Sequence, residues 1–548
     1  MIRPLNPPLR MAALFLCLSG LACPAAHAGR APQARARGEQ PWAVSAPEAQ
    51  GVSSEKLAEA VEALRADRVP VHDIVLVRHG RLILDASFFP YRRGEPHDVA
   101  SVTKSITSTL VGIAIDKGFL KSVDQPITQI FPEAVDSKDP RKQRITLASL
   151  LEMRSGLDCI RTPERGEATL LEMLGRPDWV AYTLGLPMAD EPGARFVYCS
   201  SGMHVLSGAI SKATGRNELA FGEEYLFRPL GIRRPLWPTD GQGRSSGYGS
   251  LELRPTDMAK VGYLFLHRGV WNGRRLLSSE WIREATEAHP PGGPYGYGWW
   301  IGHDFAPFAY AADGRGSQAI AVDPALDLVA AVVAGISKPA DGAEVKRLIL
   351  GAMVSDAPLP PDPAGRAHLS AALARAAAPP KGHPAASLPK AAAAISGRTI
   401  DLDDNLFGLR SLTLEFSGRR TAKARISYSG VLARWLLDPM NSNRAKTTGL
   451  VPVGLDGVPR ISRPPGGGLP AALDGAWTDD HSFVLRYDTV TGINKLIVTV
   501  SVAGKGVGVT IEEPTLGAQA KVVGRFRQTR APMLGDSRHS GRRGYSQF

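Results

Sequence analysis

The sequence predicts an α/β domain followed by a small antiparallel β domain. Between residues 45 and 355, pairs of short apolar segments typical of strands lie before and after several apolar segments of helical length. Proline and alanine then dominate residues 356–394, which is typical of a linker, with room for one short helix around 371–378. Over 395–528 apolar residues recur at every second position, the period of half-buried strands, with glycine-rich turns between the strands.

Several segments of the first domain can be assigned individually. Ser53 and Ser54 precede an amphipathic stretch, which predicts a helix capped by a serine hydroxyl. A turn at His79–Gly80 divides 73–85 into two short strands. A long apolar helix is expected over 101–118. Further helices are expected near 147–153 and 202–213, and a pair of strands near 317–322 and 326–333.

The composition is that of a globular protein, since 43% of the 548 residues are hydrophobic and 22% are charged. These values exclude a collagen-like or wholly disordered chain. The 65 basic and 53 acidic residues give a formal charge of +12, and much of the excess lies near the carboxyl end. A basic tail of this kind is more often solvated than bound to nucleic acid. We therefore predict a disordered basic tail over 529–548 and no nucleic-acid partner.

The amino end has the pattern of an export signal. Two arginines precede the apolar run 11–22, which is too short to span a membrane, and small residues precede a cleavage point after Ala28. Cys23 raises the alternative of a lipoprotein, but Gly20 stands where a bulky aliphatic residue is expected. We predict a signal peptide over 1–28, a periplasmic or secreted mature protein and no transmembrane segment.

Removal of that signal peptide leaves two cysteines, Cys159 and Cys199. An oxidising compartment permits one disulfide between them, but their separation in space cannot be read from the sequence. The cysteines show no C-x-x-C motif and the histidines no H-x-x-x-H motif, so we predict no metal site and no cofactor.

The motif Ser-x-x-Lys occurs three times, and its surroundings favour one copy. A serine and a lysine three residues apart on a helix share a face, and a buried lysine can lose its charge and accept the hydroxyl proton. The first copy opens an amphipathic surface helix, where capping explains the serine, and the third has a proline inside the motif. Only the second begins a strongly apolar helix. The copies are Ser53/Lys56, Ser101/Lys104 and Ser387/Lys390.

A second candidate nucleophile is Ser245, in a Gly-x-Ser-x-Gly sequence over 243–247. The nucleophile elbow with this motif needs a strand before it and a helix after it. Here proline and glycine residues flank the motif on both sides, which predicts a loop.

The segments around Ser101 resemble the serine β-lactamase-related hydrolases. This family includes class C β-lactamases, low-molecular-weight penicillin-binding proteins, and related esterases and amide hydrolases. The resemblance implies a β-lactamase/transpeptidase-like α/β sandwich, with an antiparallel sheet flanked by helices, over 45–355. The C-terminal β domain resembles more loosely a domain carried by some exported members. The matching segments, in family order, are 98–108, 145–157, 192–202, 226–232 and 251–258.

The resemblance implies roles for individual residues. Ser101 corresponds to the acylated nucleophile and Lys104 to its proton acceptor. Tyr198 corresponds to the tyrosine of the second motif, which passes a proton between nucleophile and leaving group. Ser200 stands where lactamases usually have asparagine, although its hydroxyl can still donate a hydrogen bond.

The third motif departs further from the family pattern. Lactamases carry a Lys-Thr-Gly-like triplet on the strand that lines the site, and the best match here is Gly314-Arg315-Gly316, continuing into Ser317. A backbone N–H of Gly316 or Ser317 would pair with that of Ser101 as an oxyanion hole. The lysine that helps to hold a β-lactam carboxylate is missing. Arg315 could replace it, unless strand alternation points its side chain away.

We therefore predict an exported serine hydrolase that cleaves a small ester or amide through an acyl-enzyme on Ser101. A peptidoglycan D,D-peptidase acting on a cell-wall peptide, or a β-lactamase, is the alternative within the enzymes. A catalytically silent binding module is the alternative outside them. The aromatic run 295–300 fits either a substrate cleft or core packing, and His204 is more typical of a packing residue than of a catalytic one.

Overall fold

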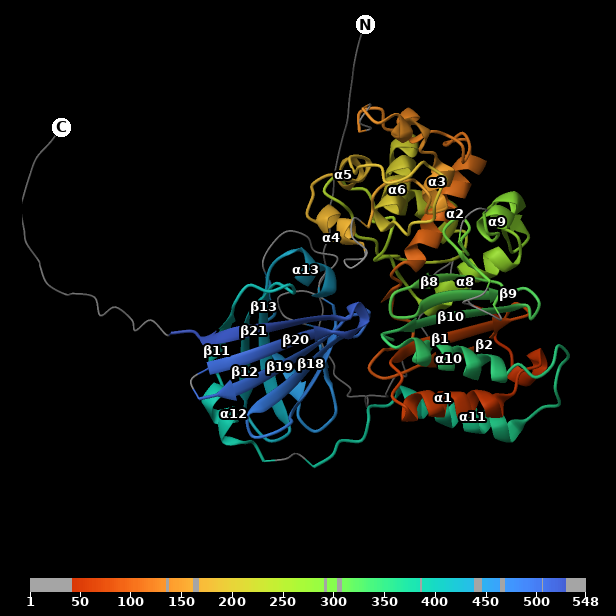
Figure 1. The fold of residues 1–548 in the computed structure, drawn as a ribbon. Coiled ribbons are helices and arrows are strands. Elements are labelled where there is room, and N and C mark those ends of the chain that lie inside the picture. The colour runs from red at the N-terminus through yellow and green to blue at the C-terminus, as the bar shows by residue number, and fades with distance from the viewer. Residues whose placement is uncertain are drawn as a thin grey trace, which may run out of the picture. The chain divides into compact units, whose positions relative to one another are not determined.

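The computed structural model is shown in Figure 1. It describes residues 42–134, 138–160, 167–289, 293–302, 308–384, 387–437, 446–463, 469–504 and 506–528. The expected signal peptide and basic tail lie outside these residues. Within them, no helix has both the length and the apolar character needed to cross a membrane.

An antiparallel sheet of six strands forms the centre of the first domain. In the middle of the sheet, β1 (Val71–Arg78) pairs with β10 (Leu328–Ala334), for example at Val75 and Ala331. This pairing brings together segments from near the beginning and the end of the domain. The turn at His79–Gly80 has positive φ at both residues and connects β1 to β2, as predicted. In order across the sheet the strands are β2 (Arg81–Ser87), β1 (Val71–Arg78), β10 (Leu328–Ala334), β9 (Gln318–Asp323), β8 (Tyr310–Gly314) and β7 (Trp300–Ile301).

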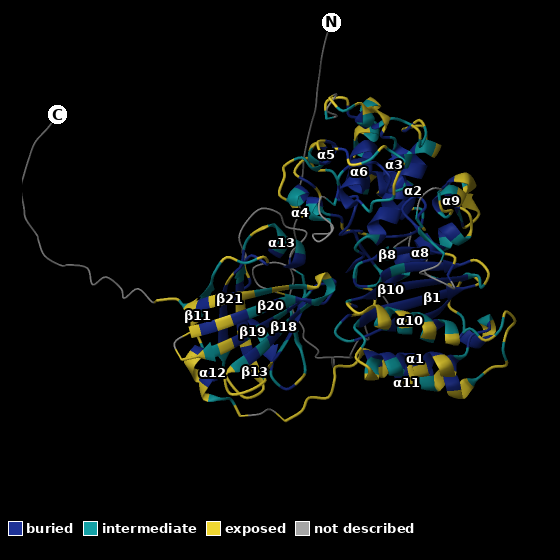
Figure 2. Cartoon of the chain, viewed as in Figure 1, coloured by how far each residue is buried: buried dark blue, intermediate teal, exposed yellow. Residues whose placement is uncertain are grey.

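Both faces of this sheet are covered, because successive side chains of a strand point to opposite faces. On β1, Val75 and Val77 belong to one hydrophobic core, and Ile74 and Leu76 belong to another. Figure 2 shows these strands as almost wholly buried. The first core includes α2 (Val102–Asp116), α6 (Ser200–Thr214) and α8 (Pro255–Leu266), and the second includes α1 (Ser54–Ala66), α10 (Pro339–Gly351) and α11 (Pro363–Ala377).

The predicted helices of the first domain are present with small shifts of their ends. Ser53 caps α1, since its hydroxyl accepts a hydrogen bond from the Lys56 backbone N–H at 3.2 Å. The expected helices near 147–153 and 202–213 are α3 (Leu147–Leu151) and α6. The remaining elements of this domain are α4 (Ala168–Leu174), α5 (Trp179–Leu184), α7 (Glu218–Gly222), α9 (Ser279–Ala285), β3 (His97–Asp98), β4 (Glu252–Leu253), β5 (Val270–Trp271), β6 (Arg274–Arg275) and short 3-10 or π turns at Pro47–Gln50, Ile127–Gln129, Pro140–Arg144 and Glu223–Phe227.

The C-terminal domain is an antiparallel β domain with its own hydrophobic core. Its strands close on themselves because β12 pairs with both β11 and β13, and a single bridge between β15 and β17 is parallel. Inward side chains alternate with outward ones, as on β18, where Phe483, Leu485 and Tyr487 are buried. The elements are α12 (Lys390–Ile395), β11 (Thr399–Leu402), β12 (Leu409–Phe416), β13 (Thr421–Tyr428), α13 (Val431–Leu437), β14 (Lys446–Thr447), β15 (Val451–Gly454), β16 (Arg460–Ser462), β17 (Ala471–Trp477), β18 (Ser482–Thr489), β19 (Lys495–Ala503), β20 (Gly506–Glu513), the 3-10 turn Pro514–Leu516 and β21 (Ala518–Phe526).

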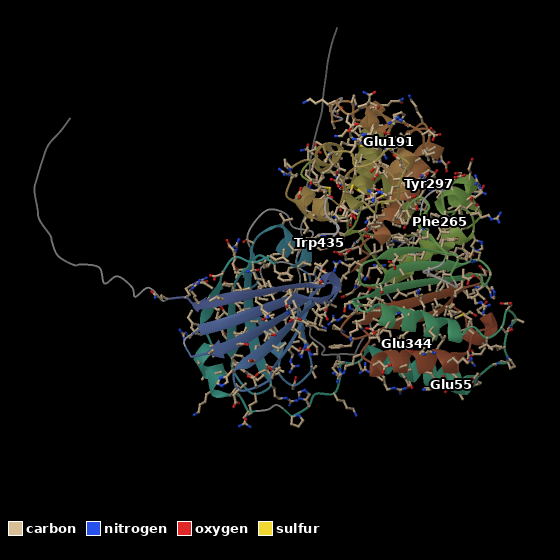
Figure 3. All side chains as sticks on the ribbon, viewed as in Figure 1. Glu55, Glu191, Phe265, Tyr297, Glu344 and Trp435 are labelled. Carbon is tan, nitrogen blue, oxygen red and sulfur yellow. A yellow bond between two sulfur atoms is a disulfide. The ribbon has the colours of Figure 1, made fainter. Side chains whose placement is uncertain are left out.

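The segment expected to be a linker contains a helix longer than the one anticipated. The helix α11 begins at Pro363, where the missing N–H costs nothing, and Asp362 caps it by accepting from the Gly365 N–H at 2.8 Å. Leu369 is buried in the core that α11 shares with α1, and His368 contacts Glu55 at 2.9 Å. Figure 3 labels Glu55 on α1. This part of the segment therefore belongs to the packed first domain.

The packing of α11 gives a stability prediction. Leu369→Ala should lower the free energy of unfolding by about 2–4 kcal/mol, because it leaves a cavity in the core beneath the sheet. Ser370→Ala, at the exposed neighbouring position, should change it by less than about 0.5 kcal/mol. Urea unfolding of the two variants measures the difference, and equal stabilities would show that α11 does not pack as described.

Candidate active site

The second Ser-x-x-Lys copy brings its two side chains into contact at the start of α2. The Nζ atom of Lys104 lies 2.7 Å from Oγ of Ser101 and donates a second hydrogen bond, 2.9 Å long, to the carbonyl oxygen of Tyr248. The Lys104 side chain is buried, and this burial lowers the pKa of its amine from 10.5 to about 8. A large fraction of the amine is therefore neutral near pH 8, and a neutral amine can accept the proton of Ser101.

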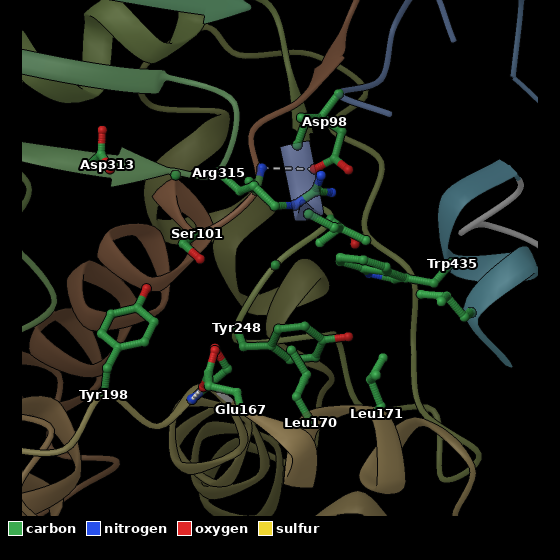
Figure 4. A pocket seen from close by; sticks show the side chains of 18 of the residues that line it. Asp98, Ser101, Glu167, Leu170, Leu171, Tyr198, Tyr248, Asp313, Arg315 and Trp435 are labelled. Atoms are coloured by element: carbon green, nitrogen blue, oxygen red, sulfur yellow. Dashed lines mark hydrogen bonds between the residues drawn. The ribbon is translucent and has the colours of Figure 1, made fainter. Parts of the chain in front are cut away.

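The turn before Ser101 holds the serine at the front of the helix. Ala100 has φ of +46°, a conformation that a residue with a side chain adopts only under constraint. One constraint is Asp98, whose Oδ1 accepts a hydrogen bond from the Ala100 N–H at 2.8 Å (Figure 4). Burial raises the pKa of the Asp98 carboxyl. The hydrogen bond from Ala100 opposes this rise, because it stabilises the charged form.

Tyr198 lies beside this pair. Its ring centre is 4.9 Å from Nζ of Lys104, and Figure 4 shows its hydroxyl directed toward Ser101. Loss of water around the phenol raises its pKa above the usual 10, although a hydrogen bond with Ser101 opposes this shift. Trp300 stacks on the Tyr198 ring with ring centres 5.8 Å apart. The phenol therefore stays protonated in the pH range where Lys104 titrates.

The residue after Tyr198 is anchored covalently. Cys199 forms a disulfide with Cys159, the pairing that the sequence left open. Cys199 also occupies the position just before α6. The disulfide thus fixes the start of α6, and with it Tyr198, to the segment that follows α3.

Ser200 lines the site but its polar groups are occupied by Glu167. The Ser200 hydroxyl donates to Oε2 of Glu167 at 2.9 Å, and its backbone N–H donates to Oε1 at 2.5 Å. A carboxylate at the first turn of α6 is favoured by the partial positive charge of a helix N-terminus. Ser200 therefore holds Glu167 at the rim of the site.

The end of β8 approaches the nucleophile from the other side. A Cβ atom added to Gly314 would lie 2.9 Å from the Ser101 backbone nitrogen, so only glycine fits. The site cavity is lined by Asp313, Gly314 and Arg315, whereas Gly316 and Ser317 are not among its lining residues. The residues of this segment that line the cavity beside Ser101 are thus Gly314 and Arg315, earlier than the pair expected to provide an N–H.

Arg315 does not present a free cation to the site. Its guanidinium donates to Oδ1 of Asn494 at 2.6 Å and to the Thr515 hydroxyl, and it stands 4.9 Å from the ring centre of Trp435. Glu513 lies 3.9 Å away. All four partners belong to the C-terminal β domain. The expectation that Arg315 could replace the missing lysine is therefore not met, because its charge is directed to that domain.

These groups surround a cavity of about 550 Å³ (Figure 4). Three of the described lining residues carry carboxyl groups, and burial raises the pKa of one of them, Asp313, to about 7. The lining residues are Asp98, Ala100, Ser101, Glu167, Leu170, Leu171, Tyr198, Ser200, Tyr248, Gly249, Ser250, Trp300, Asp313, Gly314, Arg315, Leu406, Leu432, Trp435, Ile493, Leu516 and Ala518.

Comparison with known proteins identifies the family. The β-lactamase family profile matches residues 57–353, more than half of the chain. The chain belongs to the β-lactamase family. The predicted fold class is thereby confirmed, as a β-lactamase/transpeptidase-like domain with an additional C-terminal β domain. Its members are hydrolases of the serine β-lactamase and penicillin-binding-protein type.

Individual relatives are distant from this β-lactamase-family protein. A 6-aminohexanoate-dimer hydrolase of Paenarthrobacter ureafaciens is 28% identical over 257 residues, which are 42% of this chain and 64% of the relative. The match thus spans less than two thirds of that protein. The penicillin-binding protein of Bacillus halodurans is 18% identical with a TM-score of 0.44, covering 54% of this chain and 99% of its own. An octameric penicillin-binding protein homologue from Pyrococcus abyssi is 16% identical with a TM-score of 0.44, covering 86% and 99%.

Three groups at the candidate site of this family member could not be identified from the sequence. Glu167 reaches Ser200 from 33 residues away, and the Tyr248 carbonyl reaches Lys104 from 144 residues away. Asp313 directly precedes the third-motif segment, and only its burial distinguishes it from a surface carboxylate. The sequence left open whether the aromatic run 295–300 lines a cleft or packs in the core. It does both, since Trp299 is buried in the core and Trp300 lines the cavity.

The remaining candidates have structural partners. His204 is buried against Asp240, with 3.1 Å between Nε2 and Oδ2. Ser245 lies in a loop, and its hydroxyl accepts from the Leu219 N–H at 3.1 Å. Lys390 begins α12. In the described part of the chain, no group of three or more His, Cys, Asp or Glu residues is placed to hold a metal ion.

The lowered pKa of Lys104 predicts a pH dependence. We expect a fluorophosphonate to label Ser101 faster as the pH rises through about 8, because the neutral fraction of the amine increases there. A lysine with its ordinary pKa would place the rise above pH 10. Labelling rates between pH 6 and 10 measure the midpoint. Lys56→Met, in the surface Ser-x-x-Lys copy, should leave it unchanged, and a flat profile in the wild type would contradict the assignment.

Proposed function

We propose that this protein is an exported serine hydrolase that cleaves an ester or amide through an acyl-enzyme on Ser101. The observation that carries the proposal is the 2.7 Å contact between Ser101 Oγ and a buried Lys104 amine whose pKa is lowered to about 8. A lysine that only stabilised the fold would gain nothing from such a position, since burial of a charged amine is costly.

The arrangement supports a sequence of proton transfers. Neutral Lys104 takes the proton of Ser101 as Oγ attacks the carbonyl carbon, and a tetrahedral intermediate forms. Its oxyanion is held by the Ser101 backbone N–H together with a backbone N–H at the end of β8, beside Gly314. Tyr198 donates its phenol proton to the leaving oxygen or nitrogen and takes up in its place the proton that Lys104 received from Ser101. Water then hydrolyses the acyl-enzyme, with the neutral Lys104 amine again available to accept a proton.

The charges around the cavity favour a substrate without a carboxylate. Arg315 is engaged by Asn494 and Thr515, and Lys104 is engaged by Ser101 and Tyr248. Among the described residues that line the cavity, the other charged groups are carboxyls. An anionic β-lactam or a peptide with a free terminal carboxylate is therefore recognised less well than a neutral ester or amide. The relative named as a hydrolase of 6-aminohexanoate dimers supports an amide among the substrates.

Two features support export. The apolar run that follows the amino-terminal arginines has the pattern of a cleaved signal. The disulfide between Cys159 and Cys199 suits an oxidising compartment such as the periplasm or the extracellular space.

Covalent labelling tests the nucleophile. Mature protein treated with a fluorophosphonate should gain the mass of one probe, and Ser101→Ala should gain none. Ser53→Ala and Ser245→Ala, which remove the serines of the competing motifs, should label like the wild type. A probe adduct that persists in the Ser101→Ala variant would assign the nucleophile elsewhere, and no adduct on folded wild type would favour the silent binding module.

Acylation by a fluorescent penicillin tests the alternative activity. Family membership makes a β-lactamase or D,D-peptidase the second candidate. We expect acylation to be at least about tenfold slower than cleavage of a neutral p-nitrophenyl ester, because the one cation among the described lining residues, Arg315, is bound by the β domain and is not free for the penicillin carboxylate. Rapid and stable acylation at Ser101 would instead favour the D,D-peptidase.

A further inference from the structure

The cavity beside Ser101 has two chemically different ends. Near the nucleophile the first domain supplies polar groups, among them Ser101, Tyr198, Glu167 and Asp313. The described lining residues of the C-terminal β domain are all apolar. They are Leu406, Leu432, Trp435, Ile493, Leu516 and Ala518.

Part of this apolar lining is uncovered. Leu406 is 57% exposed, and Leu516 and Leu171 are also among the large hydrophobic side chains that remain exposed in the described chain. All three line the same cavity. Exposed apolar groups gathered at the mouth of a cavity are typical of a surface that a ligand covers.

Trp435 is held in place by Arg315, the residue that follows strand β8. Arg315, directly after Gly314, stands 4.9 Å from the centre of the Trp435 ring, a cation–π contact. The same guanidinium binds Asn494, whose side-chain amide donates to the Leu436 carbonyl at 2.9 Å. Because Leu436 and Trp435 are neighbours on α13, the two hydrogen bonds of Asn494 connect this helix to Arg315, directly after Gly314.

The turn between β18 and β19 contacts the segment that precedes Ser101. The Thr491 carbonyl accepts a hydrogen bond from the Asp98 N–H at 2.9 Å. Ile493, in the same turn, lines the cavity, and a Cβ added to Gly316 would lie 2.4 Å from its side chain. The β domain is thus attached both before Ser101, at Asp98, and after Gly314, at Arg315.

We propose that Trp435 and its apolar neighbours on the β domain form the wall that selects the substrate's apolar group, and that Arg315 is the positioning residue that holds Trp435. The inference rests on the proposed acyl-enzyme function and narrows it. The substrate class is an ester or amide with an extended aliphatic or aromatic group, bound with its carbonyl at Ser101 and its apolar part against Trp435.

A chain-length series tests the wall. For p-nitrophenyl octanoate and acetate, the ratio of their kcat/KM values should fall about tenfold in Trp435→Ala and recover in Trp435→Phe, which keeps an aromatic face. Trp477→Ala is the matched control, because Trp477 packs on Phe416 and Phe483 in the same domain and does not line the cavity. A ratio in Trp435→Ala within about twofold of the wild type would overturn the proposal.

Binding without turnover separates this proposal from the proposed function. In Ser101→Ala protein, octanamide should bind more tightly than acetamide by calorimetry, and adding Trp435→Ala should weaken octanamide about tenfold. Equal octanamide binding with and without Trp435 would overturn the wall even where the wild type turns over esters. Normal binding by a wild type that forms no fluorophosphonate adduct would support the wall and contradict the acyl-enzyme.

The role of Arg315 is tested by coupling. Arg315→Met should lower the octanoate-to-acetate ratio as Trp435→Ala does, and the double variant should lower it no further, since both changes act on one ring. Arg315→Lys, which keeps the charge without the planar fork, is a second variant for the case that methionine impairs folding. Arg398→Met is the matched control, because Arg398 stacks on Phe526 outside the cavity. Fully additive losses would overturn the positioning role.

Discussion

The chemistry proposed for this protein depends on the removal of one amine from water. Lys104 is enclosed at the first turn of α2, where its Nζ atom binds Ser101 Oγ and the Tyr248 carbonyl. The fall of its pKa from 10.5 to about 8 corresponds to a few kcal/mol in favour of the neutral amine. The positive φ of Ala100, the Asp98 hydrogen bond and the close approach of Gly314 all keep Ser101 beside that amine.

The same desolvation assigns different roles to neighbouring groups. Burial disfavours charge, so it removes a proton from an amine and retains one on a phenol. In the proposed mechanism this makes Lys104 the base and keeps Tyr198 as the proton donor, although both lie at one site. Asp313, a carboxyl at the other side of the cavity, is raised to a pKa of about 7 by the same effect. One physical cause therefore separates base, donor and partly protonated acid within a single site.

The departure from the family's third motif has a structural counterpart in the β domain. In this chain the cation after Gly314 is bound by Asn494, Thr515 and the ring of Trp435, and its charge is offset by Glu513. A guanidinium suits this task because its planar fork can satisfy two acceptors while its face lies against an aromatic ring. The charge that could bind an anionic substrate instead joins two domains at the edge of the active site.

The sequence by itself determined the local parts of the structure. The spacing of three between Ser101 and Lys104 places them on one helical face, the hydroxyl of Ser53 caps its own helix, and alternation marks the strands of the β domain. These relations involve residues a few positions apart. Composition was less reliable over 356–394, because the prolines there bracket α11 and leave its interior free to form a helix.

Only the tertiary structure decided the long-range contacts. Arg315 reaches Asn494 across 179 residues, Lys104 reaches the Tyr248 carbonyl across 144, and Cys199 meets Cys159 across 40. Contacts of this kind require no particular spacing in the sequence, so no local sequence pattern predicts them. The pKa of Lys104 likewise follows from what packs around it, because desolvation is a property of the whole site and not of the motif.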